Sequence, residues 1–221
     1  LFAVDPGVVT SATNPHGGRV GFGNSEGAAI TGLGLDSNAK GKGAFSQWSS
    51  SIDGFSITGA DVGGGIMVNS WAHNLEIANN HVFGNNGSYH GGIRVGRPFL
   101  QLTGEGPFEF NTKVRIHDNA ITQNGGLGGA AGGRSRRTGT DQSSVRRNLS
   151  CGNFTTGDGG GIGHLGLSDK GVILENRIVL NQSFAQATTR SGGGLFIAGE
   201  PPAVDGLTRG SGDVTADANL L

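Results

Sequence analysis

The chain has 221 residues, enough for one sizeable domain, and its net charge of −1 excludes nucleic-acid binding through bulk positive charge. Glycine accounts for 44 residues and proline for 6, without a Gly-X-Y period, which excludes collagen and favours a turn-dense fold. No apolar run is long enough to span a membrane, and Cys151 is the single cysteine, so no internal disulfide can form.

Residues 1–50 match the repeats of the following region poorly, and we interpret them as an irregular entry or capping coil. Residues 51–221 carry the repeats and form the second unit that we expect. Leu1 is not a start methionine, and the last repeat stops in mid-pattern at Leu221. We therefore expect the chain to be a piece of a longer protein.

The repeat is clearest at residues 116–124, which read I-H-D-N-A-I-T-Q-N and define the skeleton I-x-x-N-x-I-x-x-N. The skeleton can be laid over the chain six times. Its first position falls at Ile52, Ile77, Ile116, Val145, Ile173 and Ala216. Its fourth position is Phe55, Asn80, Asn119, Asn148, Asn176 and Asn219, and its ninth is Ala60, Asn85, Asn124, Asn153 and Asn181.

A second block, G-G-[IL]-x-[VI], follows most copies of the skeleton. It occurs at 64–68, 91–95 and 193–197, with a weaker match at 160–164. Alternation predicts one interior lined by Ile66, Val68, Ile93, Val95, Ile162, Leu195 and Ile197. The same alternation places Met67, Arg94 and Phe196 on the outer face.

These columns predict an all-β fold, a parallel solenoid of about six to seven coils. One repeat cannot bury its own apolar side, so several repeats must stack. Asparagine tolerates the left-handed backbone conformation of a sharp corner. Asparagines at equivalent corners of successive coils can also hydrogen-bond into ladders, so we expect Asn80, Asn119, Asn148 and Asn176 to be buried and bonded.

The skeleton and the G-G-[IL] block resemble those of right-handed parallel β-helix proteins of the pectin-lyase-like superfamily, of the bacterial secreted or cell-surface type. The resemblance covers roughly residues 50 to 221. It implies the fold, and it leaves the activity open because this fold carries lyases, hydrolases, epimerases, adhesins and scaffolds. It also implies an extracellular or cell-surface location.

The segment 134–147 departs from the pattern. Arg134 and Arg136 fall where Ile93 and Val95 stand in the other coil, and unpaired charge in an interior is prohibitive. Either this coil is irregular, or its arginines form a basic patch for an acidic glycan. The candidate binding residues are therefore Arg134, Arg136 and Arg137, together with Arg94 and Phe196 on the outer face.

Candidate catalytic residues are Asp118, Arg147 and Glu175, which share one column in successive copies. The resemblance implies that acidic-polysaccharide lyases of this fold use calcium held by carboxylates, with Arg or Lys as base. No second acidic column supports a calcium site, and the arginine between two acids also fits a surface ion-pair ladder. Arg115 and His117 lie in nearby columns and are candidates to join such a ladder.

Two functions remain open. The first is a non-catalytic structural or binding scaffold that faces glycans or other cell-surface components, without metal or cofactor. The second is a polysaccharide lyase, hydrolase or epimerase, with calcium as the candidate cofactor. A cluster of carboxylates with Arg, Lys or His on one coil face would separate the two.

Overall fold

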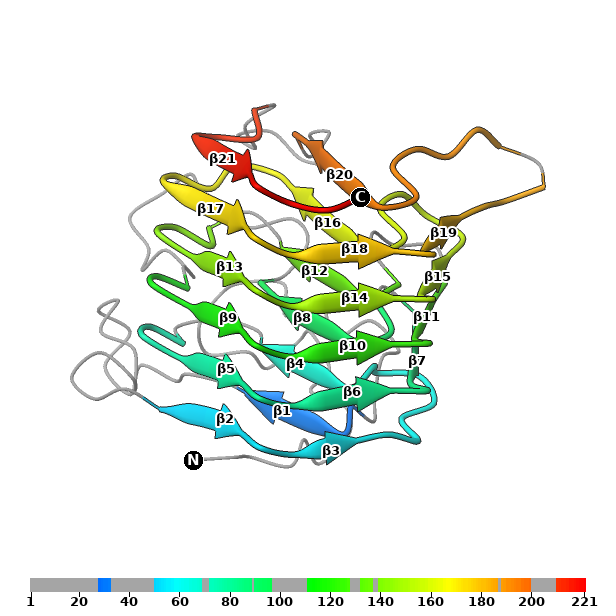
Figure 1. The fold of residues 1–221 in the computed structure, drawn as a ribbon, viewed down its shortest axis with the longest axis horizontal. Coiled ribbons are helices and arrows are strands. Elements are labelled where there is room, and N and C mark those ends of the chain that lie inside the picture. The colour runs from blue at the N-terminus through cyan, green and yellow to red at the C-terminus, as the bar shows by residue number, and fades with distance from the viewer. Residues whose placement is uncertain are drawn as a thin grey trace, which may run out of the picture.

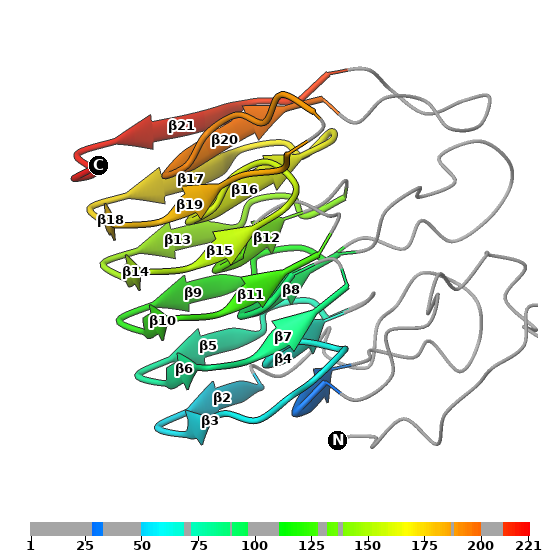
Figure 2. The same ribbon diagram turned by 90° about the vertical axis from the view of Figure 1, so that its right-hand side faces the viewer.

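The computed structural model describes residues 28–32, 50–68, 72–88, 90–96, 111–127, 132–136, 139–186, 188–199 and 210–221. Within these ranges the protein is all-β and contains no helix. Short strands pair in parallel and form four sheets, an arrangement consistent with a parallel β-solenoid (Figures 1 and 2). The predictions for residues 1–27 and 33–49 lie outside the described residues.

Sheet A runs β1 (Ile30–Gly32), β4 (Ile66–Val68), β8 (Ile93–Val95), β12 (Arg134–Arg136), β16 (Ile162–Leu165) and β20 (Leu195–Ala198). Sheet B runs β2 (Ser51–Asp53), β5 (Glu76–Ala78), β9 (Arg115–His117), β13 (Ser144–Arg146), β17 (Gly171–Leu174) and β21 (Val214–Asp217). Sheet C runs β3 (Ser56–Ile57), β6 (His81–Phe83), β10 (Ala120–Thr122), β14 (Leu149–Cys151) and β18 (Arg177–Val179). Sheet D runs β7 (Asn86–Gly87), β11 (Gly125–Gly126), β15 (Phe154–Thr155) and β19 (Gln182–Ser183).

Each passage through the sheets, here called a coil, lies directly on the one before it (Figure 1). The register follows the repeat, because the first skeleton positions pair with one another along sheet B. Ile77 stands opposite Ile52 on one side and Ile116 on the other. One repeat of the sequence therefore corresponds to one coil of the stack.

The interior is apolar where the repeat predicts it. In sheet B the central residues Ile52, Ile77, Ile116, Val145 and Ile173 are buried. In sheet A the predicted interior residues Ile66, Val68, Ile93, Val95 and Ile162 are buried as well.

Two expectations for sheet A need correction. Ile197 is 37% exposed, because β20 is the last strand of the sheet and no further strand covers it. Met67 and Arg94, which alternation places on the outer face, are each only 1% exposed. This part of the outer face is therefore buried too, which strand alternation alone does not reveal.

The asparagine columns form two ladders, as predicted. The first ladder is Asn80, Asn119, Asn148, Asn176 and Asn219, and the second is Asn85, Asn124, Asn153 and Asn181. In each step a side-chain amide donates to the side-chain oxygen of the asparagine in the next coil, at 2.9–3.0 Å. The same oxygen also accepts the backbone N–H of the preceding asparagine, as Asn148 does from Asn119 at 3.0 Å.

The left-handed corner residues are not the ladder asparagines. The positive φ angle falls one residue earlier, at Asp118 (55°), Arg147 (50°) and Glu175 (58°). The ladder asparagines are therefore required for their hydrogen bonds and not for their backbone conformation. The column before them tolerates several residue types, although a left-handed conformation is uncommon for residues other than glycine.

Candidate functional site

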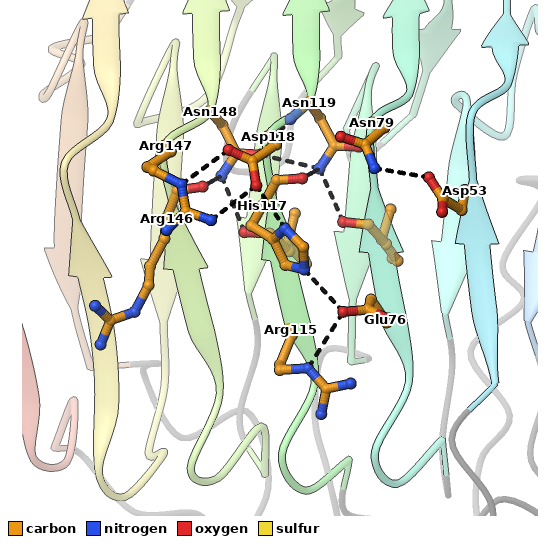
Figure 3. Close-up of polar contacts among 12 residues, drawn as sticks. Asp53, Glu76, Asn79, Arg115, His117, Asp118, Asn119, Arg146, Arg147 and Asn148 are labelled. Carbon is orange, nitrogen blue, oxygen red and sulfur yellow. Dashed lines mark hydrogen bonds and ion pairs between the residues drawn. The ribbon is translucent and has the colours of Figure 1, made fainter.

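The candidate residues Asp118, Arg147 and Glu175 lie at the corner between sheets B and C, in successive coils. Figure 3 shows the first two. Each occupies the first position of a two-residue connection, and the left-handed backbone there directs the chain into the ladder asparagine that follows. The register of β9 with β13 and of β13 with β17 places the three corners in adjacent coils.

Asp118 and Arg147 form a two-point ion pair between coils. Arg147 Nε donates to Asp118 Oδ1 at 2.9 Å, and Arg147 Nη2 donates to Asp118 Oδ2 at 2.8 Å. The hydrogen bonds from Arg147, followed by that from His117, lower the pKa of Asp118 to about 2. The side chains of Arg147 and Asp118 are 51% and 36% exposed, so water screens the pair and limits its contribution to stability.

Glu175 does not join this pair through a hydrogen bond. Among the described residues its carboxylate makes no hydrogen bond, and it contributes only a longer-range attraction that adds to the raised pKa of Arg147. The predicted ladder of three residues is therefore one close pair with a distant third charge.

The network extends instead through His117 to Glu76. His117 Nδ1 lies 2.8 Å from Asp118 Oδ2, and His117 Nε2 lies 2.9 Å from Glu76 Oε1. Arg115 Nε completes the group at 3.5 Å from Glu76 Oε1. Arg115 and His117 were candidates from the sequence, whereas Glu76 was not, although it stands in register with Arg115 in the preceding coil. Its contact with His117 crosses columns and depends on side-chain length.

Burial and hydrogen bonding act in opposite directions on His117. Burial alone lowers its pKa, but the hydrogen bonds to Glu76 and Asp118, together with the charges of both carboxylates, outweigh that effect and raise it. The hydrogen bond from His117, reinforced by the charges of Arg115 and His117, lowers the pKa of Glu76. Each carboxylate of the network is therefore held in its ionised form.

Two further contacts border the network. Asn79 Nδ2 donates to Asp53 Oδ1 at 2.9 Å across neighbouring coils. Arg146 stands in register with His117, and its Nε donates to Ser144 Oγ at 3.0 Å. Figure 3 shows the guanidinium of Arg146 directed away from Asp118.

The predicted basic patch is only partly within the described residues. The backbone of β12 is in register with its neighbours, with Arg134 opposite Ile93 and Ile162. The side chains of Arg134 and Arg136 and the whole of Arg137 lie outside the described residues.

The two outer-face candidates are not equivalent. Arg94 is 1% exposed, and its Nε donates to the carbonyl oxygen of Gly96 at 3.1 Å. It therefore does not lie on an open surface. Phe196 in β20 is half-buried.

Within the described ranges, no group of three or more His, Cys, Asp or Glu side chains is placed to hold a metal ion. The same ranges contain no helix long and apolar enough to cross a membrane. No family model, curated protein or solved structure matches the chain.

Proposed function

We propose that the chain is a right-handed parallel β-helix of the pectin-lyase-like type with about six to seven coils. We propose that it acts outside the cell or at the cell surface as a non-catalytic scaffold and binding module. The ligand class that we propose is an acidic polysaccharide.

The network brings carboxylates together with Arg and His, as an enzyme would require, but the state of these carboxylates supports the scaffold. A general acid needs a pKa near the working pH, and the pKa of Asp118 is about 2. The pKa of Glu76 is lowered as well, and both groups are neutralised by Arg147, His117 and Arg115. Side chains that are ion-paired with one another on the surface of a sheet favour a structural role over a catalytic one.

The lengths of the connections also support a scaffold. The sheet B to sheet C connections always have two residues: 54–55, 79–80, 118–119, 147–148 and 175–176. The sheet A to sheet B connections vary widely: 33–50, 69–75, 96–114, 137–143, 166–170 and 199–213. The connections from sheet D to sheet A vary as well, from 88–92 to 184–194, but less widely. A regular stack with its greatest length variation in one set of connections is typical of a rigid frame that displays binding segments.

Arg146 supports an acidic ligand. Among the described residues it forms no ion pair, and only its Nε is engaged, by Ser144. Its remaining N–H groups are free to bind a carboxylate or sulfate in two-point geometry. The arginines predicted from the sequence, Arg134, Arg136 and Arg137, remain further candidates for the same ligand.

The test incubates the purified protein with pectate, alginate and a neutral glucan, with and without calcium. We expect binding to the acidic polymers that salt weakens, without unsaturated products or new reducing ends. Arg146→Gln should weaken binding, whereas Arg177→Gln, at an exposed arginine on sheet C, is the matched control. Turnover that disappears in Asp118→Ala or Arg147→Ala would instead establish a polysaccharide-active enzyme.

A further inference from the structure

His117 is placed between two carboxylates that belong to different coils. Nδ1 is within hydrogen-bond distance of Asp118, on the same coil, and Nε2 is within hydrogen-bond distance of Glu76, on the preceding one. An ionised carboxylate only accepts hydrogen bonds, and a neutral imidazole carries a single N–H. Both contacts can be hydrogen bonds at the same time only when the ring is doubly protonated.

The charges around the ring come from three strands. β5 contributes Glu76, while the residue in register with His117 on that strand is the uncharged Ala78. Its own coil contributes Arg115 and Asp118, and the β13 coil contributes Arg146 in register with the ring. Beyond Asp118 stands Arg147, which also belongs to the β13 coil.

Loss of the ring proton breaks one of the two contacts. One ring nitrogen then presents a lone pair to a carboxylate, which is repulsive. Arg147 holds Asp118 through two bonds whatever the state of the ring. Among the described residues, the Glu76 carboxylate then keeps only Arg115 as an independent partner, at 3.5 Å.

We propose that His117 is a pH-sensitive clamp, whose doubly protonated ring ties the β5 coil through Glu76 to the Asp118–Arg147 pair. The clamp opens when the ring becomes neutral. This device is independent of whether the chain binds a glycan, because it rests on contacts within the stack.

The direction of the pH dependence follows from linkage. The pKa of His117 is raised in the folded chain relative to the value of an unperturbed histidine. The contribution of the clamp to stability is therefore fully present below the unfolded-state pKa, and it is lost as the pH rises through the folded-state pKa. The clamp is closed in mildly acidic solution and open in alkaline solution.

The direct test is an NMR titration of the imidazole nitrogens in the full chain. We expect both ring nitrogens of His117 to be protonated in mildly acidic solution. We expect the pKa of this ring to lie above that of a free histidine. Glu76→Gln and Asp118→Asn should each lower the midpoint, because each removes one carboxylate from the ring. A midpoint at or below that of free histidine in the wild-type chain overturns the proposal, and this measurement requires no variant to fold.

The second readout is the melting temperature of His117→Gln relative to the wild type at pH 6 and pH 9. The variant should melt at a lower temperature at pH 6, and the difference should disappear at pH 9. His81→Gln is the matched control, because His81 is exposed and contacts the Thr122 hydroxyl and the Phe83 ring, not a carboxylate. An equal difference at both pH values means that His117 is a packing residue and not a clamp.

Discussion

At the residue scale, the ladder asparagines explain why this skeleton repeats. Asn119 Oδ1 accepts from both the backbone N–H and the side-chain amide of Asn80, at 3.0 Å each. Its own amide lies 2.9 Å from the carbonyl oxygens of Ile77 and His117 and from Asn148 Oδ1. Aspartate lacks the N–H donors that these contacts require. Glutamine has one more methylene group, which moves its amide away from the same donors and acceptors.

Asn119→Ala should therefore destabilise the protein by roughly 1–3 kcal/mol, because it leaves buried donors and acceptors in two neighbouring coils unpaired. The measurement is the free energy of unfolding in denaturant, provided that unfolding is two-state, or otherwise the melting temperature. Asn86→Ala is the control, since Asn86 is exposed and belongs to neither ladder. Equal stability of the two variants would contradict the account of the ladders.

At the scale of the strand, the second glycine of each G-G block directly precedes a strand of sheet A. The glycine content of the sequence indicates a turn-dense fold, but the structure gives a different reason for Gly92. A Cβ atom there would clash with the carbonyl oxygen of Gly133 in the next coil, and it would lie 2.8 Å from Ile121 Cγ2. Glycine is required because the backbone of the next coil and the interior side chain of Ile121 leave no space for a Cβ atom at this position.

The equivalent position in the last described coil tests this reason. At Gly194 an added Cβ meets nothing closer than Leu221 Cδ2 at 3.4 Å, because no further strand lies beyond β20. Gly92→Ala should cost roughly 1–3 kcal/mol through overpacking, whereas Gly194→Ala should be close to neutral. Thermal melts of the two variants decide the matter, and equal losses would show that backbone conformation, not close approach, selects glycine here.

At the scale of the molecule, the sequence predicts what repeats and misses what depends on three-dimensional contact. The columns predict the parallel sheets, the buried aliphatic residues and both ladders, because stacking converts sequence spacing directly into register. They do not predict that Glu76 meets His117, since the two belong to different columns and their contact depends on side-chain reach. They also do not predict the burial of Met67 and Arg94, because alternation fixes the face of a sheet but not what covers it.

The buried apolar side chains of the described residues form two clusters. One cluster extends from Ile52 to Ile121, and the other consists of Val145, Ile162, Ile173 and Ile178 with their partly buried neighbours. The interruption coincides with Ser150, which stands between Ile121 and Ile178 in sheet C, and with the arginine-containing strand β12 in sheet A. Because stacked repeats contact only their neighbours, a weak step in the stack reduces cooperativity between its two parts. We expect the smaller cluster to lose its amide protection first in hydrogen exchange.

Ser150→Val should strengthen this step. Ser150 is buried, and Gly133 lies against it as Gly92 lies against Ile121, so we expect this position to accept a branched side chain as well. The variant loses the 3.2 Å contact of Ser150 with Asn153, whose amide keeps Ile121 and Asn181 as acceptors. We expect a gain of about 1 kcal/mol in unfolding free energy, the order expected for added buried methyl groups.

The same variant should also change how the stack unfolds. If the interruption at Ser150 limits cooperativity, filling it should slow hydrogen exchange in β16 and β18 beyond the coil that carries the substitution. Ser144→Val is the control. Ser144 lies on the outer face of sheet B, so this substitution adds no volume to the interior. Stabilisation confined to β14, with β16 and β18 unchanged, would show that the two clusters are separated by β12 and its arginines rather than by the missing side chain at position 150.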